Sequence, residues 1–214
     1  IRMLETPLLA IERSQHEIIK MADGNAKMLD WLLQLRESDN PDKALGNRLK
    51  HREQVLDAIQ DEVAAFVTGL LSGNVPHSVA DEARRQLRLA DEYESVSDYI
   101  ADLDKFDRKL RRDGHRFSPE QRSQFAELHK HLTEYLGEVN KALLQKNRNV
   151  LKNTEAASAR IRQEVKQLRR LHLEDLSHGA MAPVVSVAYL ATLNAYSRVL
   201  DHAYNIAETI AGEK

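Results

Sequence analysis

Five prolines divide the sequence into long segments, and their positions constrain the fold more than any other feature. They are Pro7, Pro41, Pro76, Pro119 and Pro183. Each lies shortly after a residue suited to capping a helix or turning the chain: Thr6, Asn40, Asn74, Ser118 and Gly179. Proline is tolerated in the first turn of a helix but not in its interior. The spacing therefore predicts five helix starts, and Ser118 followed by Gln121 has the spacing of a capping box.

A sixth helix start is expected between the last two prolines, at the cluster of Asn147, Asn149 and Asn153. Few breakers and few strand-favouring residues, with eight Gly, five Pro and 5% aromatics, indicate an all-α protein. The six predicted helices span roughly 5–36, 41–72, 77–112, 119–147, 151–177 and 182–211. Most would be about 40–50 Å long. Short connections between such long helices make neighbouring helices antiparallel.

The segment 84–106 (RRQLRLADEYESVSDYIADLDKF) has the clearest helical periodicity. One stripe is apolar, with Leu89, Tyr93, Val96, Ile100 and Leu103. A nearly opposite stripe is acidic, with Asp91, Glu94, Asp98 and Asp102. A weaker copy of the segment at 193–211 aligns Asp98 with Asp201, close to half the chain length later. The chain is therefore interpreted as one domain, 1–214, made of two pseudo-repeated three-helix bundles, repeat one about 5–112 and repeat two about 119–211.

Several classes of protein are disfavoured. A net charge of −2 gives no general attraction to nucleic acid, and the basic residues between Arg160 and Arg170 are interleaved with others, as on a solvated helix face. The absence of cysteine excludes disulfides and thiolate metal sites and suits a reducing compartment. There is no Gly-rich phosphate loop and no recognisable Ser/His/Asp set.

Two features bear on the membrane. No apolar run reaches the length of about 18 residues that a spanning helix needs. The chain begins with Ile1 instead of Met, which indicates a fragment of a longer polypeptide or a processed chain.

The acidic stripe predicts a metal site. In an antiparallel pair turning near Gly73 and Asn74, one set of carboxylates from each helix comes to the same height: Glu53 and Asp57 from the first, and Asp91, Glu94 and Asp98 from the second. Their mutual repulsion would be relieved by a divalent or trivalent cation with oxygen ligands. A solvated face opposite an apolar stripe is the simpler alternative and stays open. The corresponding positions of the second repeat are Glu155, Ala159, Ser197 and Asp201, so a second site would be largely dismantled.

Three stretches resemble the PhoU family. Residues 87–102 (LRLADEYESVSDYIAD) resemble its "ADDLERIGDHAVNIAE" type of segment, and residues 200–208 (LDHAYNIAE) are closer still to the end of that segment. Residues 52–63 (REQVLDAIQDEV) look like the other acidic helix of the family. The resemblance implies a paired E/D-x-x-x-D metal signature, which repeat one keeps as Glu53 with Asp57 and Glu94 with Asp98. Repeat two departs from that signature.

The resemblance also implies a function in phosphate transport and its regulation, without enzymatic activity. The opening segment resembles the one that follows the membrane part of bacterial Na⁺/phosphate cotransporter-like proteins. We therefore expect a cytoplasmic regulatory domain, tethered to the inner membrane through an upstream transmembrane region. Its expected partners are the membrane domain of a phosphate transporter and a second copy of the chain, and not nucleic acid.

Two alternatives remain. One is a free-standing PhoU-type regulator of phosphate uptake and signalling. The other is a metal-dependent helical-bundle enzyme that uses Glu53, Asp57, Glu94 and Asp98. An enzyme would need a concave, partly apolar pocket beside the ions.

Overall fold

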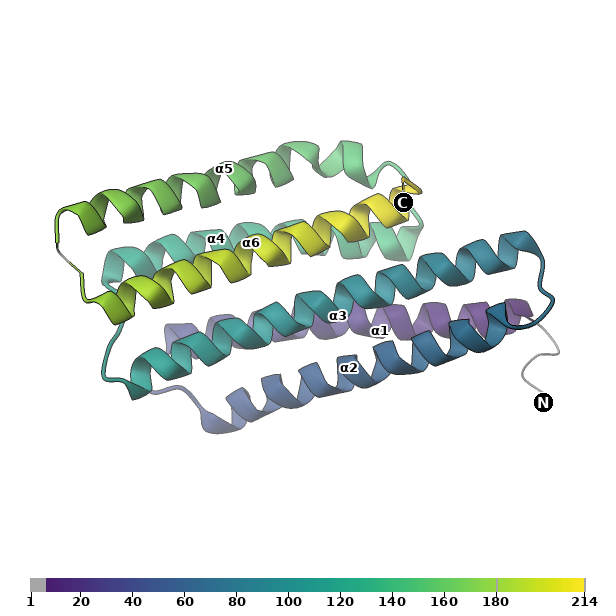
Figure 1. Ribbon diagram of the computed structural model, residues 1–214, viewed down its shortest axis with the longest axis horizontal. Coiled ribbons are helices and arrows are strands. Elements are labelled where there is room, and N and C mark those ends of the chain that lie inside the picture. Colours follow the sequence, from purple (N-terminus) through teal and green to yellow (C-terminus); the bar gives the residue numbers. More distant parts are fainter. Residues whose placement is uncertain (1–6, 180, 214) are drawn as a thin grey trace.

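The computed structural model describes residues 7–179 and 181–213, and within them the chain forms six long α-helices and no β-strand (Figure 1). The helices are α1 (Pro7–Glu37), α2 (Lys43–Leu71), α3 (His77–Arg112), α4 (Pro119–Gln145), α5 (Val150–Ser177) and α6 (Pro183–Ala211). The predicted all-α fold of six long helices is confirmed. Residues 5 and 6 of the first predicted helix lie outside the described residues.

The proline rule locates most of the helix starts. Pro119 and Pro183 are the first residues of α4 and α6. Pro76 is the N-cap residue of α3, one residue before the helix begins. Pro41 differs, because α2 begins two residues later, where the side chain of Asp42 accepts a hydrogen bond from the Ala44 amide at 2.8 Å.

The predicted capping box at the start of α4 is present. The Gln121 amide donates to Ser118 Oγ at 3.1 Å, and the Ser118 amide donates to Gln121 Oε1 at 2.9 Å. At the asparagine cluster, α4 ends before Lys146, which has the left-handed conformation, and Asn149 occupies the N-cap position of α5 without a side-chain capping bond. The turn without a proline therefore lies where it was predicted.

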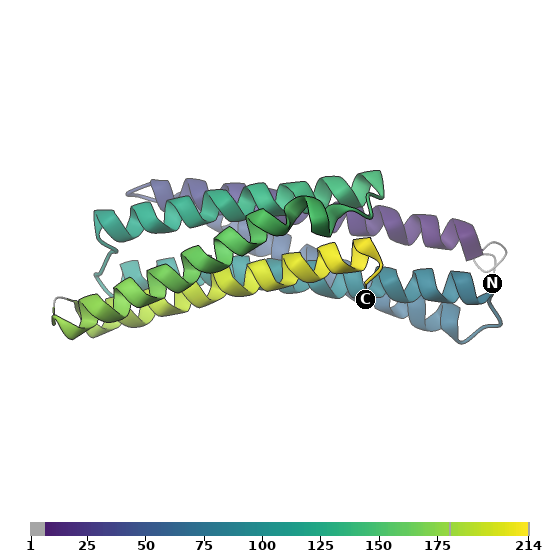
Figure 2. The same ribbon diagram turned by 90° about the horizontal axis from the view of Figure 1, so that it is seen from above.

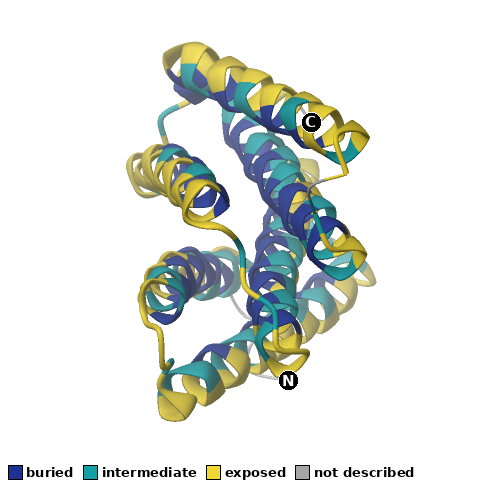
Figure 3. Cartoon of the chain, turned by 90° about the vertical axis from the view of Figure 1, so that its left-hand side faces the viewer, coloured by how far each residue is buried: buried dark blue, intermediate teal, exposed yellow. Residues whose placement is uncertain are grey.

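The helices form two three-helix units, α1–α3 and α4–α6, that pack together along their length (Figures 1 and 2). The contact between α3 and α6 is the most extensive in the molecule, and α1 also packs against α4. By contrast, α2 packs against α1 and α3, and α5 packs against α4 and α6, so both lie at the periphery. Figure 3 shows the buried residues turned toward the interior and the exposed residues covering the outside.

One continuous core joins the two units. Tyr93 of α3 is fully buried, and its hydroxyl donates to Asn140 Oδ1 on α4 at 2.7 Å. Asn140 in turn donates to the Ala22 carbonyl on α1 at 3.3 Å, and Asn25 donates to the Tyr93 carbonyl at 2.9 Å. Burial raises the pKa of Tyr93, so the phenol stays protonated and available as a donor. These bonds hold α1, α3 and α4 in fixed register.

The packing of α2 on α1 turns the acidic side of α2 outward. Gly24 of α1 is buried, and a Cβ atom at this position would lie 2.8 Å from Cδ2 of Leu56. The missing side chain therefore lets Leu56 fit closely against α1. Asp57, the next residue, is exposed, and Glu53 is half-buried.

None of the described helices has an apolar stretch long enough to cross a membrane.

Candidate functional site

The antiparallel pair α2–α3 brings the predicted carboxylates together. The pKa of Glu94 is raised to about 7, first by partial burial and then by the charge of Asp98 and a hydrogen bond with it. The pKa of Glu53 is also raised, first by partial burial and then by the charges of Asp98 and Asp57. These shifts show that Glu53, Glu94 and Asp98 are close enough to interact, with Asp57 near them.

Asp98 lies at the centre of this group. Its own pKa is raised, first by desolvation, with the negative charges of Asp57 and Asp102 adding to the effect. Hydrogen bonds from Glu94 and Glu53 act in the opposite direction, because a protonated carboxyl donates to the Asp98 carboxylate. The group therefore retains a proton near neutral pH and has affinity for positive charge.

Asp91, predicted as a further ligand, is tied to α2 by a different partner. Gln60 Nε2 donates to Asp91 Oδ1 at 2.7 Å. Asp91 is exposed. Its carboxylate therefore helps to hold α3 against α2, and it does not share in the interactions that raise the pKa values of Glu53 and Glu94.

The chemistry of these carboxylates fits a hard cation, because all the donors are oxygens and their charge is in excess. The side-chain positions do not form a ready site: in the described part of the chain, no three His, Asp or Glu side chains are grouped so that they could hold a metal ion. Binding would require Glu53, Asp57, Glu94 and Asp98 to change rotamer and close around the ion. The metal site therefore stays a prediction.

The second unit has a different arrangement at the corresponding positions. Asp201 is flanked by two guanidinium groups, with Nη1 of Arg162 3.7 Å from its Oδ1 and Nη1 of Arg198 3.7 Å from its Oδ2. The Arg162 guanidinium also lies over the ring of Tyr204, 5.0 Å from the centroid. In this unit, the protein's own arginines neutralise the acidic position.

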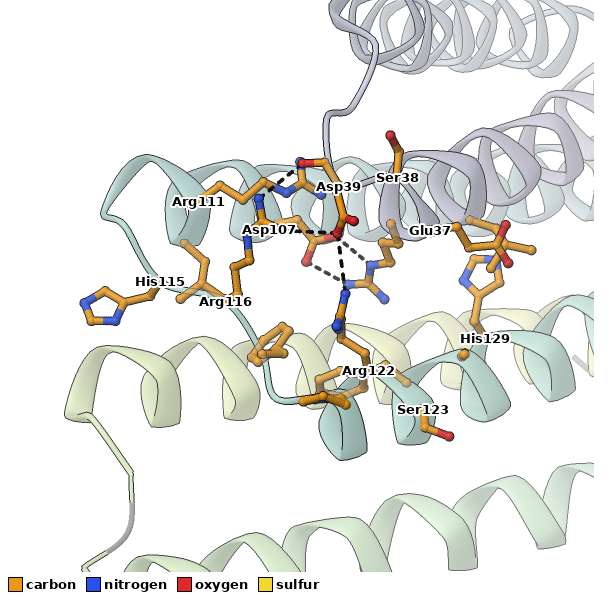
Figure 4. Close-up of a pocket in the computed structure, with 17 residues that line it drawn as sticks. Glu37, Ser38, Asp39, Asp107, Arg111, His115, Arg116, Arg122, Ser123 and His129 are labelled. Carbon is orange, nitrogen blue, oxygen red and sulfur yellow. Dashed lines mark hydrogen bonds and ion pairs between the residues drawn. The ribbon is translucent and has the colours of Figure 1, made fainter.

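A second feature, which the sequence did not predict, is a cavity of about 340 Å³ at the end of the bundle where α1 and α3 end and α4 begins. Figure 4 shows the side chains that line it. They come from the last turn of α1, residues 38 and 39, the last turns of α3, the 113–118 connection and the first turns of α4. Because the lining residues are scattered through the sequence, no local motif indicates the cavity.

A buried ion pair forms the floor of the cavity. Arg36 Nε donates to Asp107 Oδ2 at 2.6 Å, and Arg36 Nη2 donates to Asp107 Oδ1 at 3.2 Å. Burial, the largest single effect, opposes the charge of Arg36, but the carboxylate of Asp107 together with Tyr196 and Asp104 outweighs it, so the pKa of Arg36 is raised. Both charges are therefore present and satisfied.

A directed chain of hydrogen bonds continues from this pair. Arg36 Nη1 donates to the Tyr196 oxygen, and the Tyr196 hydroxyl lies 2.8 Å from His129 Nδ1. His129 Nε2 lies 3.0 Å from the Leu29 carbonyl and must therefore donate, so neutral His129 accepts from Tyr196 through Nδ1. Burial, aided by the charge of Arg36, lowers the pKa of His129 to about 4. The floor is consequently rigid, and its histidine is neutral at physiological pH.

The rim of the cavity carries exposed charge. Asp39 Oδ1 lies 3.2 Å from Arg116 Nη1 and 3.9 Å from Arg122 Nη1 (Figure 4). Arg111 Nη2 donates to the Leu35 carbonyl at 3.3 Å. This cavity and three others in the described part of the chain have no lining contribution from Glu53, Asp57, Glu94 or Asp98.

Comparison with known proteins is informative at the level of structure. No protein-family profile matches the chain, and no curated protein matches it by sequence. The structure is similar to the crystal structure of PhoU from Pseudomonas aeruginosa, with a TM-score of 0.72 and 15% sequence identity, over 96% of this chain and 97% of that one. At this identity the similarity establishes the fold alone, and it does not connect the chain to a cotransporter. The chain therefore has a PhoU-like all-α fold over nearly its whole length.

Proposed function

We propose that the chain is a regulatory, non-enzymatic domain of phosphate transport that responds to a bound cation on the α2–α3 face. The observation that carries this proposal is the acidic group of Glu53, Asp57, Glu94 and Asp98 on a PhoU-like fold. The resemblance of the sequence to the PhoU-type signature implies metal-binding carboxylates at these positions. The raised pKa values of Glu53, Glu94 and Asp98 indicate an excess of negative charge on this face.

The position of the carboxylates favours an interaction surface over a catalytic centre. They lie on partly exposed helix faces, and Asp57 and Asp98 are exposed. An enzyme using them would need a concave pocket that surrounds the substrate beside the ions. The cavity above the Arg36–Asp107 pair lies instead at the end of the bundle and has arginines in its wall.

The regulatory step would be a change in the attachment of α2. A cation among the four carboxylates removes their repulsion and draws α2 toward α3. Because α2 contacts only two helices extensively, it is the element of the first unit that can move with the least loss of packing. A bound cation changes the docking of this domain on a partner protein only if the cation binds the docked and the free domain with different affinities.

The proposed partner is the membrane domain of a phosphate transporter. In its most specific form, the proposal makes the chain the cytoplasmic domain of a Na⁺/phosphate cotransporter-like protein, tethered to the inner membrane. A free-standing regulator of phosphate uptake would use the same α2–α3 face. Sequencing the natural gene upstream of Ile1 distinguishes these two forms, because the first requires membrane-spanning segments there.

The test of the site is calorimetric titration of metal-free protein with Mg²⁺, Mn²⁺, Zn²⁺ and Fe³⁺. We expect a cation to bind wild-type protein, and the double variant Glu94→Gln, Asp98→Asn to lose this binding. The matched control is Asp61→Asn, Glu62→Gln, which removes the same charge from exposed positions of α2. Equal affinity in both double variants would refute the assignment of these ligands.

The test of the regulatory role is phosphate uptake by cells that express the natural full-length protein. The full-length protein with Glu94→Gln and Asp98→Asn should show a changed phosphate uptake or a changed response to external phosphate. The full-length protein with Asp61→Asn and Glu62→Gln should not. Unchanged uptake and response in the first variant would contradict the regulatory role.

A further inference from the structure

We propose that the cavity between the ends of α1, α3 and α4 binds a small organic anion, a molecule with one phosphate or carboxylate group on a compact apolar body, and that Asp39 lies where the anionic group of this ligand would bind. This inference is independent of the function proposed for the α2–α3 face, because the two sites share no residue.

The floor of the cavity is built in advance of any ligand. Arg36 and Asp107 neutralise each other, and their side chains are only 14% and 9% exposed. The chain from Arg36 through Tyr196 and His129 to the Leu29 carbonyl fixes their positions. A binding surface that needs no reordering retains more of its interaction energy on binding.

The wall supplies the apolar part of the site. Its exposed area is more apolar than polar, with Leu33, Leu110, Phe117 and Phe125 among the lining residues. The rings of Phe117 and Phe125 lie 5.2 Å apart at a tilt of 60°. A volume of about 340 Å³ is at the lower end of the range for small-molecule sites, so the apolar body must be compact, of the size of one aromatic ring or a little more.

The rim supplies positive charge in excess. With the floor pair of Arg36 and Asp107 balanced, the lining still contains the arginines Arg111, Arg116 and Arg122 and the acids Glu37 and Asp39. Arg122 belongs to the first turn of α4, where the helix dipole also favours an anion. If the side chain of Asp39 swings out, two positive charges remain uncompensated at the mouth of the cavity.

Asp39 indicates where the anion binds. A single oxygen of its carboxylate is approached by guanidinium groups from two different segments, Arg116 and Arg122. The Asp39 side chain is 84% exposed and those of the arginines are 58% and 52% exposed, so this contact is weak. An oxyanion of a ligand held by the apolar wall can therefore replace the carboxylate and take over both guanidinium groups.

The experiment is calorimetric titration of the full chain with phenyl phosphate, which combines one aromatic ring with a phosphate. We expect binding with a Kd of roughly a millimolar or lower. Inorganic phosphate lacks the apolar body and phenol lacks the charge, so each should bind at least about ten times more weakly. Equal binding of phenyl phosphate and inorganic phosphate would overturn the proposed class of ligand. Replacing phenyl phosphate with benzoate determines whether a carboxylate serves as well as a phosphate.

Three variants test the geometry. Arg116→Ala with Arg122→Ala should weaken phenyl phosphate binding at least about tenfold, whereas Asp39→Ala should strengthen it roughly threefold or more, because the competing carboxylate is gone. Arg169→Ala with Arg170→Ala is the matched control on the exposed face of α5 and should change nothing. Circular dichroism and Tm confirm that each variant is folded. Weaker binding in Asp39→Ala, or no heat from wild type and Asp39→Ala at about 20 mM ligand, would overturn the proposal.

Discussion

The face formed by α2 and α3 and the corresponding face formed by α5 and α6 share one helical framework but balance charge in opposite ways. On the first face, partial burial and the charge of Asp98 raise the pKa values of Glu53 and Glu94, and partial burial and the charges of Asp57 and Asp102 raise that of Asp98. On the second face, Asp201 is held between Arg162 and Arg198. On the second face the arginines compensate the carboxylate, whereas the first face retains an excess of negative charge. This difference in charge balance is the basis for proposing the first face, and not the second, as a cation-binding surface.

The largest expected effect is the pH dependence of the free energy of unfolding that buried His129 causes. It must be known before the stabilities of variants on the two faces are compared at different pH values. The pKa of His129 is about 4 in the folded protein and about 6.5 unfolded, so its contribution to stability is full above pH 6.5 and is lost as the pH falls toward 4. This loss is about 3 kcal/mol between about pH 7 and pH 4. His129→Gln retains a donor for Leu29 and an acceptor for Tyr196 and should remove most of the loss, as measured by urea unfolding at both pH values. His16→Gln, on the exposed side of α1, is the control, and an unaltered pH profile in His129→Gln would contradict the assignment.

The next largest effect should follow from making the first face resemble the second. Gln60 and Ser95 occupy the positions that correspond to Arg162 and Arg198. Gln60→Arg with Ser95→Arg should place two guanidinium groups beside the carboxylates and weaken cation binding by about 100-fold, as measured by calorimetry. Gln163→Arg with Ser177→Arg adds the same charge to α5 and should leave that binding unchanged. Undiminished cation binding in the first variant would show that the charge balance does not distinguish the two faces.

A smaller effect of opposite sign to that of His129 is expected from Glu94. Its folded pKa of about 7 lies above the unfolded value of 4.5, so this group destabilises the fold increasingly as the pH rises from 4.5 to 7. Glu94→Gln should therefore stabilise metal-free protein above pH 7, by roughly 0.5–1 kcal/mol, since solvent screens a partly exposed group. Urea unfolding in the His129→Gln background measures this gain without the opposing titration. A loss of stability would show that the Glu94 carboxylate is already compensated.

The smallest effect should be found on the second face. Asp201→Asn removes the partner of two arginines and should lower Tm by about 1 °C, because the ion pairs are long and partly exposed. The contrast in sign is informative: removing a carboxylate stabilises the first face and slightly destabilises the second. Differential scanning calorimetry of Asp201→Asn beside Glu94→Gln measures both, and the same sign in the two variants would remove the distinction between the faces.

The sequence predicts the helices better than it predicts their surfaces. Proline positions and caps depend on local backbone chemistry, and for this reason α3, α4 and α6 begin within a residue of where they were expected. Pro41 gave a start two residues too early because Asp42, the residue after it, supplies the cap. The approach of the acidic groups of α2 and α3 could be predicted because a short turn fixes the register of an antiparallel pair.

The remaining features depend on how each helix is rotated and on which helix ends meet. Arg162 belongs to a basic run that was interpreted as a solvated face, and its contact with Asp201 follows only from the packing of α5 on α6. The end cavity unites Arg36, Asp107 and Arg122, which lie far apart in the sequence, and no periodicity links them. Such contacts are long-range, so they cannot be inferred from local patterns.

The titration of Glu94 tests most directly whether the first face is left uncompensated for a cation. The carboxyl ¹³C resonance of Glu94 can be followed by NMR from about pH 3 to pH 9, with and without the cation that binds most tightly. We expect a midpoint at about 7 in metal-free protein, and a downward displacement of that midpoint when the cation is added, because a bound cation favours the charged carboxylate. A midpoint at the ordinary value of 4.5 that no cation displaces would contradict the assignment of the α2–α3 face as a cation-binding surface.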